Sequence, residues 1–157
     1  YCCDTMRPMM CALPLAFEDD PICAGIGDQY MFGRSTMVAP ILNPGGKRKV
    51  YLPKGTWFDY WTKAAIEGGV YIDVECPIDR YPLFVRDGAL IPMIPECNRL
   101  PEGALPQLTV EVYRDQKEPA PYMVADVEPF EIRYRSGAIR CSLPGPTDEA
   151  IVIEFGK

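Results

Sequence analysis

Carboxyl groups are the first residues to consider, because two of them facing one scissile bond can act as general acid and general base. Asp19 and Asp20 are adjacent, and Asp28 follows a short way along the chain. Adjacent residues rarely face one cleft, however, and an acidic residue directly before Pro21 is typical of the start of a helix. We therefore predict capping roles for these three aspartates.

An aromatic cluster at residues 57–61 offers a second kind of chemistry. Exposed rings of Trp57, Tyr60 and Trp61 could stack on sugar rings and bind an oligosaccharide. Alternating aromatics in a strand more often place one ring in the core and the next at an edge. We favour the core-and-edge interpretation and keep Trp57, Tyr60 and Trp61 as candidate substrate-binding residues.

Histidine is absent from all 157 residues. Its absence removes the Ser-His-Asp and Cys-His nucleophile systems, the HExxH zinc sites and every imidazole general base. The sequence also lacks GxGxxG and GxxxxGK[ST], the Gly-rich loops that bind phosphates. We therefore expect no metal site and no cofactor.

Seven cysteines are present, and no two of them form a CxxC motif. An odd number would leave one thiol over in a closed disulfide framework. Reduced, mostly buried thiols in a cytoplasmic protein are the simpler interpretation.

The formal net charge is −6, which disfavours binding to nucleic acid or to an anionic membrane surface. No apolar run approaches the roughly 20 residues that a membrane-spanning helix needs. The first residues, Tyr-Cys-Cys-Asp, include neither an initiator Met nor a signal-peptide pattern. We expect the chain to be a piece of a longer protein or a trimmed product.

Seventeen prolines spread through the chain disfavour long helices. We predict a mainly β fold, in which an antiparallel β-sandwich follows a short strand-helix segment. Residues 6–17 are apolar enough for a buried strand, and one helix is expected over 22–32, closed by Gly33. The predicted domains are residues 1–34 and residues 35–157.

Short runs separated by turn residues follow residue 35, at a spacing typical of a β-sandwich. Asp87-Gly88 lies between two such runs and is a hairpin signal. Residues 95–107 are rich in proline and polar residues, which indicates a linker or a crossover between sheets. We expect the strands beyond to complete the same sandwich. The runs predicted as strands are 36–42, 49–52, 57–61, 70–76, 83–86, 89–94, 108–114, 130–135, 138–143 and 150–155.

Six motifs follow one another in a specific order and spacing. They are MRPMM (6–10), FEDDP (17–21), DQYMFG (28–33), MVAP (37–40), VYLPKGTWFDYW (50–61) and YPLFVRDGALIP (81–92). Together they resemble the late segment of glycoside hydrolase family 31, strongly over residues 5–94 and loosely over the remainder.

Members of that family include α-glucosidases and α-xylosidases, which are retaining enzymes with a (β/α)₈ barrel flanked by β-domains. The resemblance implies that residues 1–34 are the remnant of the last barrel strand and helix, and that 35–157 form the C-terminal β-sandwich. It also implies that the nucleophile and the acid/base lie upstream. No residue of this chain is then catalytic, and the chain alone is expected to be inactive.

Two functional hypotheses stay open. The chain is either the non-catalytic part of a retaining α-glycosidase that supports its barrel, or a stand-alone β-sandwich that binds carbohydrate or a protein partner. An orphan apolar strand within residues 1–20 predicts contact with the missing barrel, self-association, or folding back onto the sandwich. The apolar residues that lead to this prediction are Met6, Met9, Met10, Leu13, Leu15 and Phe17.

Overall fold

The computed structural model describes residues 8–96 and 109–114 in full, and the backbone of four further strands at 123–127, 130–135, 138–141 and 151–155. The chain divides into two compact units, Cys2–Asp87 and Gly88–Lys157. We call them the N-terminal unit and the C-terminal unit. The predicted domain division into residues 1–34 and 35–157 stays a prediction. The boundary between the N-terminal unit and the C-terminal unit lies between Asp87 and Gly88.

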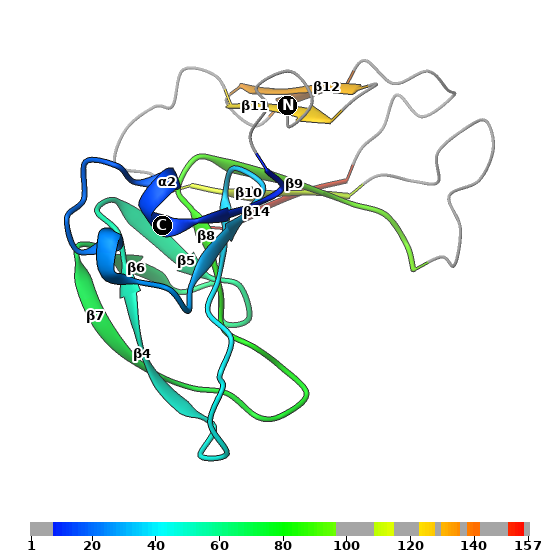
Figure 1. Ribbon diagram of the computed structural model, residues 1–157. Helices are drawn as coiled ribbons and strands as arrows, with labels where there is room; N and C mark the ends of the chain where they lie inside the picture. The colour runs from blue at the N-terminus through cyan, green and yellow to red at the C-terminus, as the bar shows by residue number, and fades with distance from the viewer. Residues whose placement is uncertain are drawn as a thin grey trace. The chain divides into compact units, whose positions relative to one another are not determined.

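The N-terminal unit is built almost entirely from short antiparallel strands (Figure 1). Six of them form one sheet in the order β1-β2-β3-β8-β5-β6, and two form the β4-β7 ribbon. The elements are β1 (Met10–Ala12), α2 (Leu13–Ala16), the 3₁₀ helix η1 (Cys23–Gly25), β2 (Tyr30–Phe32), β3 (Thr36–Val38), β4 (Lys47–Leu52), β5 (Thr56–Asp59), β6 (Ala65–Glu67), β7 (Val70–Glu75) and β8 (Leu83–Arg86).

The C-terminal unit is also made of strands. Its two sheets have the orders β14-β10-β9 and β11-β12-β13. All pairs are antiparallel except β10 with β14, which run parallel. The strands are β9 (Ala89–Met93), β10 (Thr109–Tyr113), β11 (Met123–Val127), β12 (Phe130–Arg135), β13 (Ala138–Cys141) and β14 (Ile151–Phe155). The prediction of a mainly β, mostly antiparallel fold is confirmed.

Most of the predicted linker at 95–107 lies outside the described residues. The strands on either side of it are nevertheless neighbours, because β9 pairs with β10 from Ala89↔Tyr113 to Met93↔Thr109. The segment therefore joins two adjacent antiparallel strands of one sheet.

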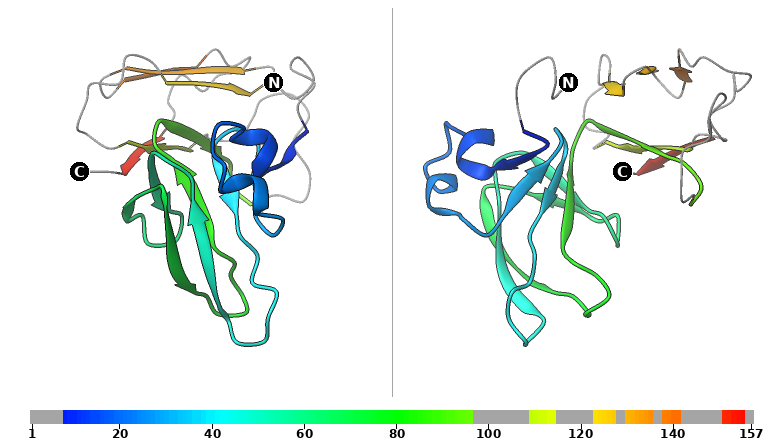
Figure 2. Two further views of the ribbon diagram at one scale, coloured as in Figure 1. Left: turned by 60° about the vertical axis from the view of Figure 1, so that its left-hand side comes forward. Right: turned by 45° about the vertical axis from the view of Figure 1, so that its right-hand side comes forward.

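The core of the N-terminal unit is formed mainly by side chains of its six-stranded sheet and of the β4-β7 ribbon, whose backbones Figure 2 shows. Side chains alternate across a strand, so one face of each layer can bury its apolar residues against the other. The buried core residues are Cys11, Leu13, Cys23, Ile26, Met31, Met37, Ala39, Val50, Tyr51, Leu52, Trp57 and Phe84.

The helix predicted over residues 22–32 is wrong. Only Cys23–Gly25 form a helical turn, of the 3₁₀ type, and Tyr30–Phe32 pair with β1 and β3 as strand β2. Gly25 and Gly27 weaken any helix here, because each glycine costs about 1 kcal/mol relative to alanine. Gly33 has a φ of 65° and lies in the turn between β2 and β3.

The strand predicted over residues 6–17 is shorter than expected. Its described part is β1 at Met10–Ala12, and the short helix α2 begins directly afterwards at Leu13. Pro14 lies in the first turn of that helix, where its missing N–H costs nothing. The four-residue helix α2 therefore occupies residues that the sequence assigned to a strand.

The hairpin predicted at Asp87-Gly88 is also wrong. Strand β8 pairs with β3 and β5, whereas β9 pairs with β10. The Asp87 N–H donates to Thr56 and the Gly88 N–H donates to Tyr113. Gly88 has a φ of 86°, a conformation that glycine adopts without strain, and the chain passes there from one sheet to another.

Gln29 makes the principal buried polar contact of the N-terminal unit, and its side chain is 4% exposed. Its Nε2 donates to the Tyr51 carbonyl at 2.8 Å, and its Oε1 accepts from the Tyr51 N–H at 2.9 Å. In an antiparallel ribbon, alternate residues direct both backbone groups away from the partner strand. The amide of Gln29 takes the place of a further strand beside Tyr51, and so ties the segment before β2 to β4.

We predict that Gln29→Leu lowers the free energy of unfolding by about 2–5 kcal/mol, because it leaves a buried N–H and a buried C=O without partners. Urea denaturation followed by circular dichroism measures the change. Asn43→Leu is the matched control, because Asn43 makes two hydrogen bonds at an exposed site. Equal losses from the two variants would contradict the role given to Gln29.

Candidate functional site

Asp20 holds the turn that precedes η1 and also contacts the core. Its Oδ1 accepts from the Ile22 N–H at 3.1 Å, and its backbone carbonyl accepts from the Cys23 N–H at 3.0 Å. Its Oδ2 accepts from the Tyr51 hydroxyl at 2.8 Å. The helix that Asp20 was predicted to cap is absent, and η1 has Ile22 as its N-cap without a side-chain capping bond. Asp20 instead holds the turn before η1 and anchors a core tyrosine.

Asp28 and Asp59 are also bound within the fold. Asp28 forms an ion pair with Arg48 at 2.6 Å, and the Arg48 side chain is mostly buried. Asp59 accepts hydrogen bonds through Oδ1 from the N–H groups of Trp61 and Thr62 and from the Thr62 hydroxyl. These carboxylates position a turn or a cation, and none of these contacts places two of them across a shared cleft.

Burial suppresses the acidity of two groups beside Asp20. Burial raises the pKa of the Cys23 thiol to about 11, and the nearby Asp20 carboxylate adds to this effect. Burial likewise raises the pKa of Tyr51 to about 12, helped by its hydrogen bond to Asp20. Because the thiolate is the reactive form, Cys23 is a poor nucleophile near neutral pH.

Trp57 belongs to the core. Its side chain is 1% exposed, and its Nε1 donates to the Pro53 carbonyl at 2.7 Å. Its ring centroid lies 6.1 Å from that of Phe17. A buried ring offers no face to a ligand, so the structure places Trp57 apart from the other two candidate sugar-binding residues.

Tyr60 and Trp61 lie together, with ring centroids 5.2 Å apart in a T-shaped arrangement. Lys63 Nζ lies 4.2 Å from the Tyr60 centroid, and the Arg80 guanidinium lies 5.0 Å from the Trp61 centroid. Trp61 Nε1 donates to the Tyr81 carbonyl at 2.9 Å, and its side chain is 39% exposed. Cations therefore cover part of the ring surface that a sugar would need, and sugar binding by Tyr60 and Trp61 stays a prediction.

An exposed apolar surface lies on β1 and β2, on the face of the sheet opposite the core. It comprises two cross-strand pairs, Met10↔Phe32 and Ala12↔Tyr30, which we call the outer strip. Met10 is 57% exposed and Phe32 is 49% exposed. Between these pairs, Cys11 and Met31 point into the core.

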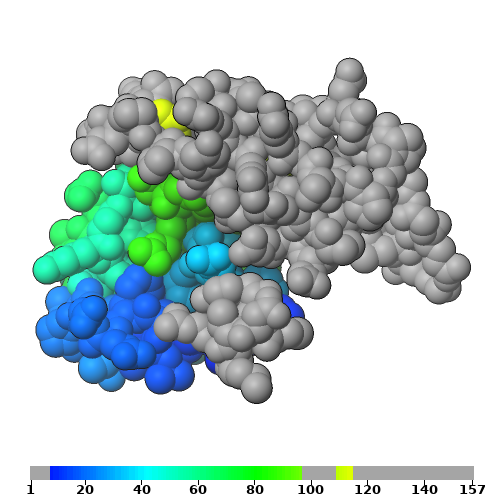
Figure 3. Space-filling view, turned by 90° about the horizontal axis from the view of Figure 1, so that it is seen from above, coloured from blue at the N-terminus to red at the C-terminus, as the bar shows by residue number. Residues whose placement is uncertain are grey.

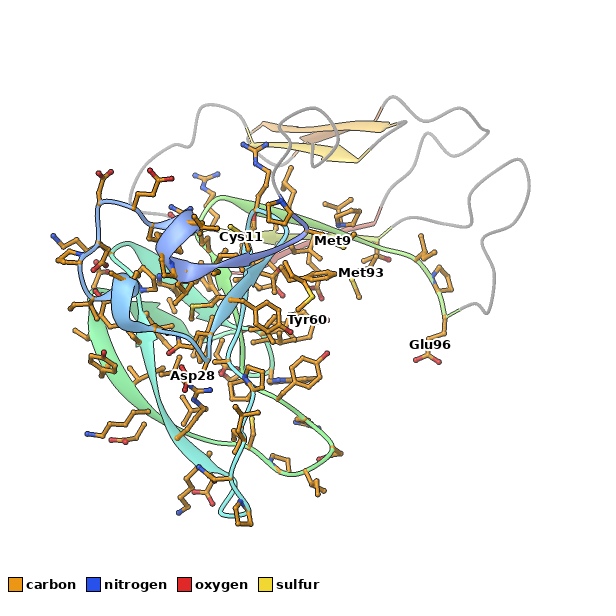
Figure 4. All side chains as sticks on the ribbon, in the orientation of Figure 1. Met9, Cys11, Asp28, Tyr60, Met93 and Glu96 are labelled. Carbon is orange, nitrogen blue, oxygen red and sulfur yellow. The ribbon has the colours of Figure 1, made fainter. Side chains whose placement is uncertain are left out.

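The space-filling view in Figure 3 shows the early residues of the described chain, in blue, at the molecular surface. Met9, labelled in Figure 4 and directly before β1, and Leu15 are exposed as well. The sequence predicted the exposure of Met9, Met10 and Leu15 but not that of Phe32, and it did not foresee that Leu13 is fully buried.

In the described part of the chain, no group of three or more potential ligand side chains could hold a metal ion. The helices described here are all too short to cross a membrane.

The chain is similar to known carbohydrate-active enzymes. Residues 6–91 match the model of the glycosyl hydrolase family 31 C-terminal domain. Alpha-glucosidase 2 of Bacillus thermoamyloliquefaciens is 30% identical over 135 residues, and the isomaltosyltransferase of Sporosarcina globispora is 42% identical over 91 residues. The solved structure of a GH31 α-xylosidase from Xanthomonas citri aligns with a TM-score of 0.76 at 26% identity.

These alignments cover much of this chain and little of the other proteins. They span 85%, 57% and 98% of this chain, respectively. They span only 17% of the α-glucosidase, 8% of the isomaltosyltransferase and 19% of the α-xylosidase. Most of each related protein therefore has no counterpart in these residues.

The raised pKa of Tyr51 predicts a loss of stability at alkaline pH. The folded state keeps the phenol proton up to about pH 12, whereas the ordinary pKa is 10.0, so the unfolded state loses that proton first. The free energy of unfolding should fall as the pH rises from 10 to 12. Urea denaturation of the protein and of Tyr51→Phe across this range tests the effect, and equally steep declines would contradict it.

Proposed function

This chain belongs to glycosyl hydrolase family 31, and we propose that it is the non-catalytic C-terminal part of a retaining α-glycosidase whose barrel it supports. The match of residues 6–91 to the family's C-terminal domain carries this proposal. The missing catalytic barrel is then the natural partner of the chain. The enzyme is of the α-glucosidase or α-xylosidase kind, as are two of the related proteins.

The chemistry of retaining enzymes explains why this chain alone should be inactive. A retaining glycosidase needs a carboxylate nucleophile and a carboxylic acid/base about 5–5.5 Å apart on either side of the glycosidic bond. Asp20, Asp28 and Asp59 make the hydrogen bonds and the ion pair that hold the N-terminal unit together. They support a structural role for the carboxylates of this chain.

The retaining mechanism also explains how a transferase can be related to hydrolases. A retaining enzyme forms a covalent glycosyl-enzyme intermediate, which water then hydrolyses. A sugar hydroxyl that takes the place of water gives transfer, and one relative is an isomaltosyltransferase. The groups that choose between water and sugar belong to the barrel in our proposal.

We place the protein in the cytoplasm. Among the residues described, Cys11, Cys23 and Cys76 are free thiols. Disulfides form and persist in oxidising compartments, whereas thiols stay reduced in the cytosol. The free thiols of the N-terminal unit therefore favour a reducing compartment for this protein.

The alternative is a stand-alone β-sandwich that binds carbohydrate through Trp61. The 39% exposure of that ring favours it, and the Arg80 guanidinium above the ring opposes it. Calorimetric titration of the chain with isomaltose separates the two functions. Binding that Trp61→Ala abolishes and Leu42→Ala preserves would support the alternative.

We predict that the 157-residue chain does not hydrolyse p-nitrophenyl α-glucoside or p-nitrophenyl α-xyloside. The longer protein encoded by the same gene should hydrolyse at least one of them, because it would supply both carboxyl groups. Release of p-nitrophenol by the two purified proteins is the measurement. Turnover by the chain that survives repurification, or a gene without an upstream barrel, would overturn the proposed function.

A further inference from the structure

The face of the six-stranded sheet opposite the core carries several apolar side chains, although Thr36, Thr56 and Glu67 also lie on it. An antiparallel sheet that faces water on one side carries polar residues there. The outer strip lies opposite the core, yet Met10, Ala12, Tyr30 and Phe32 include no charged side chain. Met10 and Phe32, which face each other across β1 and β2, are both about half exposed.

The apolar character continues across the same face of the neighbouring strands. Register places Val38 beside Tyr30, Val85 beside Thr36, and Phe58 beside Val85. Val38, Val85 and Phe58 are buried although they lie outside the core between the two layers. Buried apolar side chains on β3, β8 and β5 therefore share a face with the half-exposed Met10 and Phe32.

We infer that the outer strip is the docking surface for the catalytic barrel of the longer enzyme. This inference rests on the proposed function. In the related α-xylosidase, the matching residues make up 19% of the polypeptide, so about four fifths of that protein lies outside them. A partner of that size in the same polypeptide is available to cover the strip.

The side chains of the outer strip favour an apolar protein surface as the binding partner. Methionine and aromatic side chains are enriched at protein interfaces, whereas charged residues are depleted at their centres. A sugar needs several placed polar groups, and apart from the Tyr30 hydroxyl the strip's side chains supply none. The complementary surface on the barrel is apolar.

Size favours a covalently linked partner over a second copy. A stable complex between separate proteins usually buries at least about 1,000 Å² in total. The strip has four side chains, two of them about half exposed, which is little area for a dimer. A partner in the same polypeptide loses less translational and rotational freedom when it docks than a separate protein does. A small strip is therefore sufficient.

Photo-crosslinking in the longer enzyme tests the inference. Phe32→p-benzoylphenylalanine places an aromatic crosslinker in the strip, where a half-exposed ring leaves room for the added benzoyl group. After irradiation, mass spectrometry should identify a peptide from outside the 157 residues joined to position 32, at the mass of one polypeptide. Leu42→p-benzoylphenylalanine is the matched control, because Leu42 is 80% exposed between β3 and β4 and should not give this peptide.

The outcomes separate the inference from the proposed function. If the longer enzyme hydrolyses an α-glycoside but position 32 crosslinks only within the 157 residues, or as often as position 42, the inference alone fails. Crosslinking to a second polypeptide would identify another copy as the occupant and overturn the inference. A longer protein with no barrel overturns both proposals.

A stability measurement gives an independent test. Phe32→Lys should lower the temperature at which the longer enzyme loses half of its activity, whereas Leu42→Lys should leave it unchanged. Neither substitution should shift the urea midpoint of the 157-residue chain, because both side chains are exposed there. A Phe32→Lys enzyme as heat-resistant as the parent would contradict docking at the strip.

Discussion

The paired hydrogen bonds between the Gln29 amide and the Tyr51 backbone are the interaction on which the N-terminal unit depends. They satisfy a buried N–H and a buried C=O on the side of β4 that faces away from β7. With its backbone fixed in this way, the Tyr51 ring lies 5.0 Å from Tyr71 and its hydroxyl reaches Asp20. One amide thus links the segment before β2, the β4-β7 ribbon and the turn that precedes Cys23.

The carboxylates of Asp20, Asp28 and Asp59 likewise make structural contacts in this unit. A general acid or nucleophile must remain free to meet a substrate, whereas Asp20, Asp28 and Asp59 are committed to a hydroxyl, a guanidinium and a turn. Each of these three side chains holds a turn or a neighbouring segment of the unit in place. Such a role agrees with membership of glycosyl hydrolase family 31 through the C-terminal domain.

The sequence predicted most of the strands, though not β2, β6 or β11, because alternating residues and turn signals are local. It failed where distant partners decide the outcome. Nothing near residues 22–32 reveals that Tyr30–Phe32 pair with two strands, and nothing near Gln29 reveals a partner 22 residues away. Trp57 and Trp61 look alike in sequence, yet one is in the core and the other is at the surface. β5 ends at Asp59, so Trp57 lies within the strand and faces the core, whereas Trp61 lies in the turn that follows.

The outer strip also has a consequence for synthesis on the ribosome. Domains fold largely as units, with N-terminal ones first, and exposed apolar surface on an incomplete chain promotes aggregation. In the enzyme that we propose, the barrel is translated before the strip, so Met10 and Phe32 leave the ribosome when their partner is already available. A gene order with the strip first would leave these side chains uncovered for the whole time needed to make the barrel.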